Sequence, residues 1–192
     1  DLTGIEAFTG ITALRCYNNS LTSLDVSQNT ALTYLTCNVN SITSLDLSAN
    51  TLLTHLECNN NLLTSLDLSN NPSLNFMFCF NMTSLTALNM ASGGNTNFTT
   101  FNSTNCPNLT CIQVDNATYS TTNWTSIDAA SSFSTNCNYP CLVTIPDANF
   151  KAYLVGNTAI NTNADTEIQC SEASAFMGTI NCASLSISDL TG

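Results

Sequence analysis

Four cysteines stand at a constant spacing in the first half of the chain. Cys16, Cys37, Cys58 and Cys79 are separated by 37−16, 58−37 and 79−58, each of which is 21 residues. From residue 21 the chain repeats one 21-residue motif with this spacing: LTSLDVSQNTALTYLTCNVNS, ITSLDLSANTLLTHLECNNNL and LTSLDLSNNPSLNFMFCFNMT. A fixed period of this length with Leu-x-x-Leu-x-Cys-x-x-Asn inside it is typical of leucine-rich-repeat solenoids.

The alternation of side chains along a strand predicts which residues of each coil point inward. On a first face these are Leu14/Cys16, Leu35/Cys37, Leu56/Cys58 and Met77/Cys79. On a second face they are Leu24/Val26, Leu45/Leu47 and Leu66/Leu68. Because 21 residues leave little room for a helix, and Thr, Ser and Asn disfavour one, we expect two β faces in every coil.

The repeat is less regular after residue 85. A fourth coil slips by one residue and places Leu88/Met90 on the second face, and a turn-rich insertion follows at residues 92–95. A fifth coil is degenerate, with Phe101/Ser103 on the first face and Ile112/Val114 on the second. The prediction is a mostly β solenoid of about five 21-residue coils, with small α/β cap segments.

The chain divides into three expected segments. The solenoid occupies residues 1–114, and a C-terminal cap with a short helix over 122–130 and a linker occupies 115–141. In 142–192, Pro146 and Asp147 ahead of apolar residues predict a helix start, followed by strand 168–170, helix 171–176 and strand 185–187. This last segment has the character of an N-terminal cap.

Charge and composition exclude several classes of partner. The 192 residues include 2 Lys+Arg against 13 Asp+Glu, for a formal charge of −11. Nucleic acid and anionic membranes are therefore not expected, because the cations that contact phosphates are missing. A surface made from Ser, Thr and Asn, together with ten cysteines, indicates an extracellular or cell-surface location. No nucleophile with a base and a third group is evident, so we expect no enzyme activity.

The two ends of the chain carry the same four residues. Asp1-Leu2-Thr3-Gly4 recurs as Asp189-Leu190-Thr191-Gly192, an offset of 189−1 = 188 residues. This match predicts that the chain is one period of a longer tandem array, in which copies join head to tail.

Several of these stretches resemble a known group. The motifs LTSLDVSQN, IPDANFKAYL, SISDLTG and NLTCIQVD, with the Leu-x-Cys-x-x-Asn rungs, are similar to internalin-like leucine-rich-repeat modules of large secreted surface proteins from gliding Gram-negative bacteria. The resemblance implies an exported protein with adhesive or scaffolding duties and no catalytic residues. In that group the cap helix precedes the repeats, whereas this chain begins in the middle of that order.

The cysteines fall into two sets. Cys16, Cys37, Cys58 and Cys79 point inward among leucines without a histidine, so we interpret them as small buried hydrophobes rather than metal ligands. Parallel rungs also give poor disulfide geometry. The other six allow many connectivities. We expect Cys111–Cys137 and Cys170–Cys182, which leaves Cys106–Cys141 as the third pair.

Polar columns recur with the same period. Asn19, Asn40 and Asn61 follow one face and Asn29, Asn50 and Asn71 follow the other, where they are expected to satisfy backbone groups at the bends. Asp25, Asp46 and Asp67 form an outward column ended by Asn89. Water and neighbouring hydroxyls are expected to screen these charges, and bridging by Ca²⁺ is the alternative; no other cofactor is expected.

The outward positions of the first face vary most. They become more aromatic along the chain and form a candidate binding face for a glycan or a protein: Tyr34, His55, Glu57, Phe76, Phe78 and Phe80. An equal alternative is that the insertion after Met90 covers the three phenylalanines. A structural fibre or adhesin unit is the leading hypothesis, a binding module the second, and ice binding by the Thr22/Thr43/Thr64 column a third.

Overall fold

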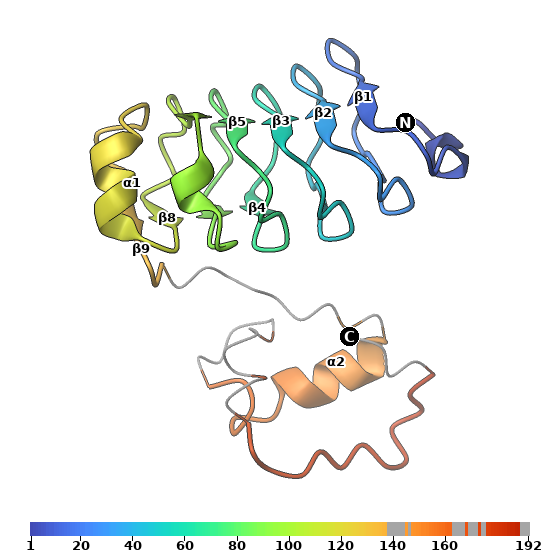
Figure 1. Cartoon of the computed structure of the whole chain (residues 1–192). Coiled ribbons are helices and arrows are strands. Elements are labelled where there is room, and N and C mark those ends of the chain that lie inside the picture. The colour runs from blue at the N-terminus through green and yellow to red at the C-terminus, as the bar shows by residue number, and fades with distance from the viewer. Residues whose placement is uncertain (138–144, 146, 163–167, 169–172, 174–175, 189–192) are drawn as a thin grey trace. The chain divides into compact units, whose positions relative to one another are not determined.

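The computed structural model is a β-solenoid followed by a smaller unit. It describes residues 1–137, 145, 147–162, 168, 173 and 176–188. The chain divides into two compact units, Asp1–Tyr139 and Pro140–Gly192. The first unit is the predicted solenoid, whose coils follow one another from β1 to α1 in Figure 1.

Five short parallel strands build the first sheet. They are β1 (Ala13–Arg15), β2 (Tyr34–Thr36), β3 (His55–Glu57), β5 (Phe76–Phe78) and β7 (Thr100–Asn102), paired in that order. The register aligns the inward residues Leu14, Leu35, Leu56, Met77 and Phe101. Leu35, Leu56 and Met77 are fully buried, as the alternation of the repeat predicts.

The second sheet begins later than expected. Its strands are β4 (Ser65–Asp67), β6 (Ala87–Asn89), β8 (Cys111–Gln113) and β9 (Ser132–Ser134). The prediction of a strand on this face in every coil is wrong, because residues 22–26 and 43–47 form none. Their inward side chains are buried all the same, among them Val26 at 1% and Leu47 at 0% exposure. On the second face of the early coils, burial of apolar side chains rather than strand pairing therefore holds the chain in place.

The irregular coils behave as predicted. Leu66 pairs with Leu88, which is the expected slip of one residue, since 88−66 is 22. The fifth coil supplies β7 on the first sheet and β8 on the second. The insertion contains the short 3₁₀ helix η2 (Asn95–Asn97), and a second such helix, η1 (Ile5–Ala7), precedes the first coil.

A helix and a final rung close the solenoid. The helix α1 spans Ala117–Asn123, five residues earlier than predicted, because the Asn116 side chain accepts a hydrogen bond from the Tyr119 amide and caps it there. Trp124 follows the helix, is 4% exposed and stacks on Phe101 with 4.7 Å between ring centroids. The predicted role of the tryptophan, covering the last open rung, is confirmed, although it lies just after the helix.

The second unit contains one well-defined helix. α2 spans Ala148–Val155 and begins at the predicted point, where Asp147 accepts hydrogen bonds from the amides of Asn149 and Phe150. Residues 185–187 are not the predicted strand, since Ser184 and Ser186 have φ values of 62° and 55°. The predicted strand 168–170 and helix 171–176 lie mostly outside the described residues, as does the second copy of DLTG. Ile145, Leu154, Ile160 and Ile168 form a separate small core.

Candidate functional site: the outward face of the first sheet

The alternation of the first sheet places two columns of side chains on its outward face. The sheet register aligns Tyr34, His55 and Phe76 in one column, and Thr36, Glu57 and Phe78 in the next. Adjacent strands lie about 4.8 Å apart. Side chains in a column are therefore close enough to stack. We call Tyr34, His55, Phe76, Phe78 and Phe80 the aromatic row.

The first three rings of the aromatic row form a continuous stack. Tyr34 and His55 have ring centroids 4.1 Å apart with 13° between planes, and His55 and Phe76 have 4.1 Å and 11°. The Arg15 guanidinium carbon lies 4.5 Å from the centroid of the Tyr34 ring and extends the stack by a cation–π contact. The sequence analysis predicted the rings of this face but did not include Arg15. Arg15 pairs with Thr36 on the next strand and therefore lies on the same outward face.

The remaining rings turn relative to the stack. Phe76 and Phe78 are tilted by 55° at 4.7 Å, and Phe78 and Phe80 meet edge to face at 5.6 Å. All three phenylalanines are half-buried. Such edge-to-face pairs add stabilisation beyond the area that they bury.

The insertion after Met90 is held at a different place. Asn95 donates to the Met90 carbonyl and accepts from the Asp115 amide, and the Tyr119 hydroxyl donates to the Thr96 carbonyl. Phe98 packs on Phe101 and Trp124, at the capped end of the core. These contacts tie the insertion to the cap, and none of those recorded for the described residues joins it to the aromatic row.

His55 of the aromatic row pairs with Glu57 on the same strand. The His55 Nε2 atom lies 2.9 Å from Glu57 Oε1, and the two side chains are 18% and 25% exposed. Because an ionised carboxylate can only accept, the imidazole donates from Nε2. The pair fixes the ring orientation within the stack.

The cysteine column is longer than the period indicates. Cys16, Cys37, Cys58 and Cys79 are buried free thiols, and Cys106 joins them, with its Sγ 3.2 Å from the Cys79 carbonyl oxygen. The interval 106−79 is 27 residues, so a search at a period of 21 misses this member. Burial raises the pKa of the Cys16 thiol to about 11 and holds the pKa of the next three well above the ordinary value.

All three predicted disulfides have outcomes. Cys111 and Cys137 are bonded, as predicted, which links β8 to the end of the cap. Cys106 is free, which contradicts its pairing with Cys141, and Cys182 is a free, half-buried thiol, which contradicts its pairing with Cys170. Cys141 and Cys170 lie outside the described residues. Cys106 belongs to the buried column because its coil, although longer, returns to the same inward position.

The asparagines bind the backbone of adjacent coils. Asn61 donates to the Cys37 and Cys58 carbonyls at 3.0 and 2.9 Å and accepts from the Ile42 amide at 3.0 Å. Asn40 repeats this pattern one coil earlier. At the other bend, Asn29, Asn50 and Asn71 each donate to two carbonyls. Each carboxamide therefore joins neighbouring coils where the strands have ended.

The aspartate column is used in local turns. Asp25, Asp46 and Asp67 each accept from the amide two residues later at 2.9 Å, and Asn89 donates to Asp67. The hydrogen bond from the Ser27 amide lowers the pKa of Asp25. Among the described residues no group of three or more His, Cys, Asp or Glu side chains is placed to hold a metal ion. Ca²⁺ binding by this column stays a prediction.

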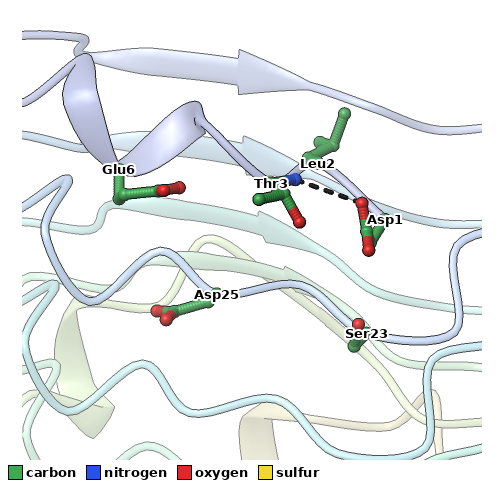
Figure 2. A pocket seen from close by; sticks show the side chains of 6 residues that line it. All are labelled: Asp1, Leu2, Thr3, Glu6, Ser23 and Asp25. Carbon is green, nitrogen blue, oxygen red and sulfur yellow. Dashed lines mark hydrogen bonds between the residues drawn. The ribbon is translucent and has the colours of Figure 1, made fainter.

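A small hollow lies beside the first coil. It has a volume of about 200 Å³ and is lined by Asp1, Leu2, Thr3, Glu6, Ser23 and Asp25 (Figure 2). Glu6 accepts from the Gly4 amide, and Asp1 accepts from the Thr3 amide. The carboxylates of this hollow are thus engaged by local backbone.

In the part of the chain that the structure describes, no helix is long and apolar enough to cross a membrane.

Comparisons with known proteins find similar solved structures. No family model and no curated protein matches the chain. A functional domain of InlJ from Listeria monocytogenes that includes a cysteine ladder is 39% identical over 59% of this chain and 27% of that chain, with a TM-score of 0.49. The internalin InlF from the same species is 22% identical over 59% and 38%, with a TM-score of 0.48.

A third similar structure is a leucine-rich-repeat protein of Leptospira interrogans, 16% identical over 68% of this chain and 38% of that chain, with a TM-score of 0.40. The chain therefore spans 27% to 38% of the length of these three proteins. Over part of its length the chain is similar to InlJ, to the internalin InlF and to a leucine-rich-repeat protein of Leptospira interrogans.

Proposed function

We propose that this chain is an extracellular leucine-rich-repeat module that binds a macromolecular partner, a protein or a glycan, on the outward face of its first sheet. The observation that carries the proposal is the aromatic row, which gathers five rings on one face of a chain whose surface is rich in Ser, Thr and Asn. Aromatic side chains gathered on one exposed face are typical of interaction surfaces. The Cys111–Cys137 disulfide supports an oxidising, exported location.

Attachment of labelled protein to cells and matrix of its own source tests this proposal. Tyr34→Ala combined with Phe78→Ser removes two rings of the row, and we expect attachment to fall at least about tenfold, since interface aromatics dominate binding. Thr43→Ala, an exposed change on the second face, is the matched control and should attach as the unchanged chain does. Equal attachment by the double variant, with an unchanged circular dichroism spectrum, would contradict the proposal.

A second candidate is a unit of a tandem fibre or adhesin. One observation favours it: the tetrapeptide Asp-Leu-Thr-Gly occurs twice, at an offset of 188 residues, as expected for repeats of a tandem array. Electron micrographs of the native protein test this candidate, and a single 20.5 kDa monomer as the native species would contradict it.

A further inference from the structure

We infer that the outward face of the first sheet takes a polypeptide segment that sets a carboxylate against Arg15 and apolar side chains along the aromatic row. The inference rests on the proposed function and narrows its partner from a macromolecule in general to an acidic, partly apolar peptide. Three independent features of the face support it: the orientation of the rings, the distribution of charge, and the apolar residues at its border.

The rings of the stack offer their edges to solvent. Tyr34, His55 and Phe76 stack along the direction that crosses the strands, with planes within 13° of one another. Each inner ring face is therefore covered by the next ring, and Arg15 covers the outer face of Tyr34. Sugar rings bind aromatic side chains face on, and the stack has no such face free between its members. Ring edges carry partial positive charge and attract carbonyl and carboxylate oxygens.

The charge of the face differs from that of the rest of the solenoid. Arg15 is the one Lys or Arg among residues 1–139, against eight Asp and Glu, and its side chain is exposed. Within the five strands of the first sheet Glu57 is the sole acidic residue, and His55 already occupies its carboxylate. The aspartate column lies on the second face. A single carboxylate of a bound peptide would therefore find a complementary positive group at Arg15. A polyanion, in contrast, would be repelled by the net negative charge of the solenoid.

Apolar residues replace polar ones at the border of the row. Tyr17, Val39 and Leu62 are 48%, 42% and 48% exposed. Val39 stands in a column otherwise made of asparagines, and Leu62 in one otherwise made of Ser and Thr. These side chains follow β1, β2 and β3 in the first three coils, in and just after the bend at which the chain leaves the first sheet. Exposed apolar groups of this kind suit Leu, Ile or Phe side chains of a peptide better than the hydroxyls of a sugar.

Selection of random peptides displayed on phage against the immobilised full chain tests the inference. We expect the enriched peptides to carry Asp or Glu next to Leu, Ile or Phe. Arg15→Met, which keeps the stem and removes the charge, should raise their Kd at least about tenfold. Arg15→Lys should cost less, and Asp46→Asn on the second face should change nothing. Replacing the peptide carboxylate by its amide should have no further effect on the Arg15→Met variant.

The outcomes separate this inference from the proposed function. Peptides that bind Arg15→Met as tightly as the unchanged chain, but not Tyr34→Ala, would overturn the carboxylate pairing and leave the binding face in place. Binding of cellohexaose or chitohexaose that depends on Tyr34, without enriched peptides, would overturn the inference and leave the proposed function. Peptides insensitive to both Arg15→Met and Tyr34→Ala would contradict both, and so would the absence of any peptide or oligosaccharide binding.

Discussion

At the scale of single residues, exceptions to the repeat carry the most information. One column of the first bend has left-handed backbone in every coil, at Asn18, Val39, Asn60, Asn81 and Asn105, with φ between 55° and 57°. Asn81 donates to Asn60, and Asn105 to Asn81, through their side-chain amides. Asparagine tolerates this conformation, whereas a β-branched residue is strained in it. Val39 thus costs stability at a position that borders the proposed binding face, where strain can be retained for function.

Val39→Asn should therefore stabilise the chain by about 1 kcal/mol, because it removes the strain of a β-branched left-handed residue. The new amide would also stand next to Asn18 and Asn60 in the column. Thermal unfolding followed by circular dichroism measures the effect, with Val39→Ala as a control that should gain less. A lower melting temperature for Val39→Asn would contradict the reading of this position. If Val39 contacts the partner, the stabilised variant should also bind more weakly.

The bend asparagines should differ in importance along the solenoid. Asn61→Ala removes three hydrogen bonds to buried backbone groups, and we expect a loss of about 2–4 kcal/mol in the free energy of unfolding. Asn19→Ala is the matched variant in the first coil, where the side chain is exposed and donates only to carbonyls of its own turn. It should cost about 1 kcal/mol or less. Urea unfolding measures both, and equal losses would show that the cross-coil bonds contribute little.

At the scale of elements, the cysteine column is a row of buried thiols that follows the strands of the first sheet. Alkylation with iodoacetamide followed by peptide mass spectrometry should leave Cys37, Cys58 and Cys79 unmodified until the protein unfolds. Cys16 should react first within the column, since it lies in the first coil. Its reaction should still be about 100-fold slower than that of an ordinary thiol at pH 8, because its pKa is about 11. Rapid modification of Cys58 in the native protein would contradict this account.

The helix of the second unit should depend on pH. Hydrogen bonds from the Ser188 and Phe150 amides hold the pKa of Asp147 well below its usual range. A depressed folded-state pKa contributes stability that is complete above about pH 4, the pKa of an unfolded aspartate, and that declines as the pH falls below it. Protection of the Ser188 amide proton, which is its exchange rate relative to the intrinsic rate at the same pH, should therefore fall as the pH drops from about 4 to about 2. Asp147→Asn should remove that dependence, and a flat profile in the unchanged chain would contradict it.

At the scale of the whole molecule, the period of the sequence predicts the solenoid well because each coil contacts mainly its neighbours. A leucine such as Leu56 needs only the coils before and after it to be buried, so the repeat alone places it. The Cys111–Cys137 bond and the cover supplied by Trp124 involve residues beyond the periodic part, and they are predicted from the cap segment rather than from the repeat. Where the period fails, so does the prediction: Cys106 is hidden by a longer interval, and α1 begins at a cap, Asn116, that the hydrophobic pattern does not mark.

The face of the first sheet illustrates what the sequence leaves open. The aromatic residues are evident in the sequence, but their arrangement as a stack with edges outward depends on rotamers and on the sheet register. The role of Arg15 depends on the same register, because it meets Tyr34 across coils rather than along the chain. The sequence also leaves open whether the insertion covers the aromatic face. The contacts of Phe98 and Asn95, which hold the insertion at the cap, decide between the two alternatives.

The most direct test of the central claim is photo-cross-linking on the full chain. p-Benzoylphenylalanine replaces Phe78 on the first sheet in one variant and Ser44, exposed on the second face, in the other. After irradiation with extracellular material from the protein's own source, we expect a discrete protein adduct from the Phe78 position only, reduced by Arg15→Met. Adducts from Ser44 alone, or equal adducts from both positions, would contradict the assignment of the first sheet's outward face as the binding surface.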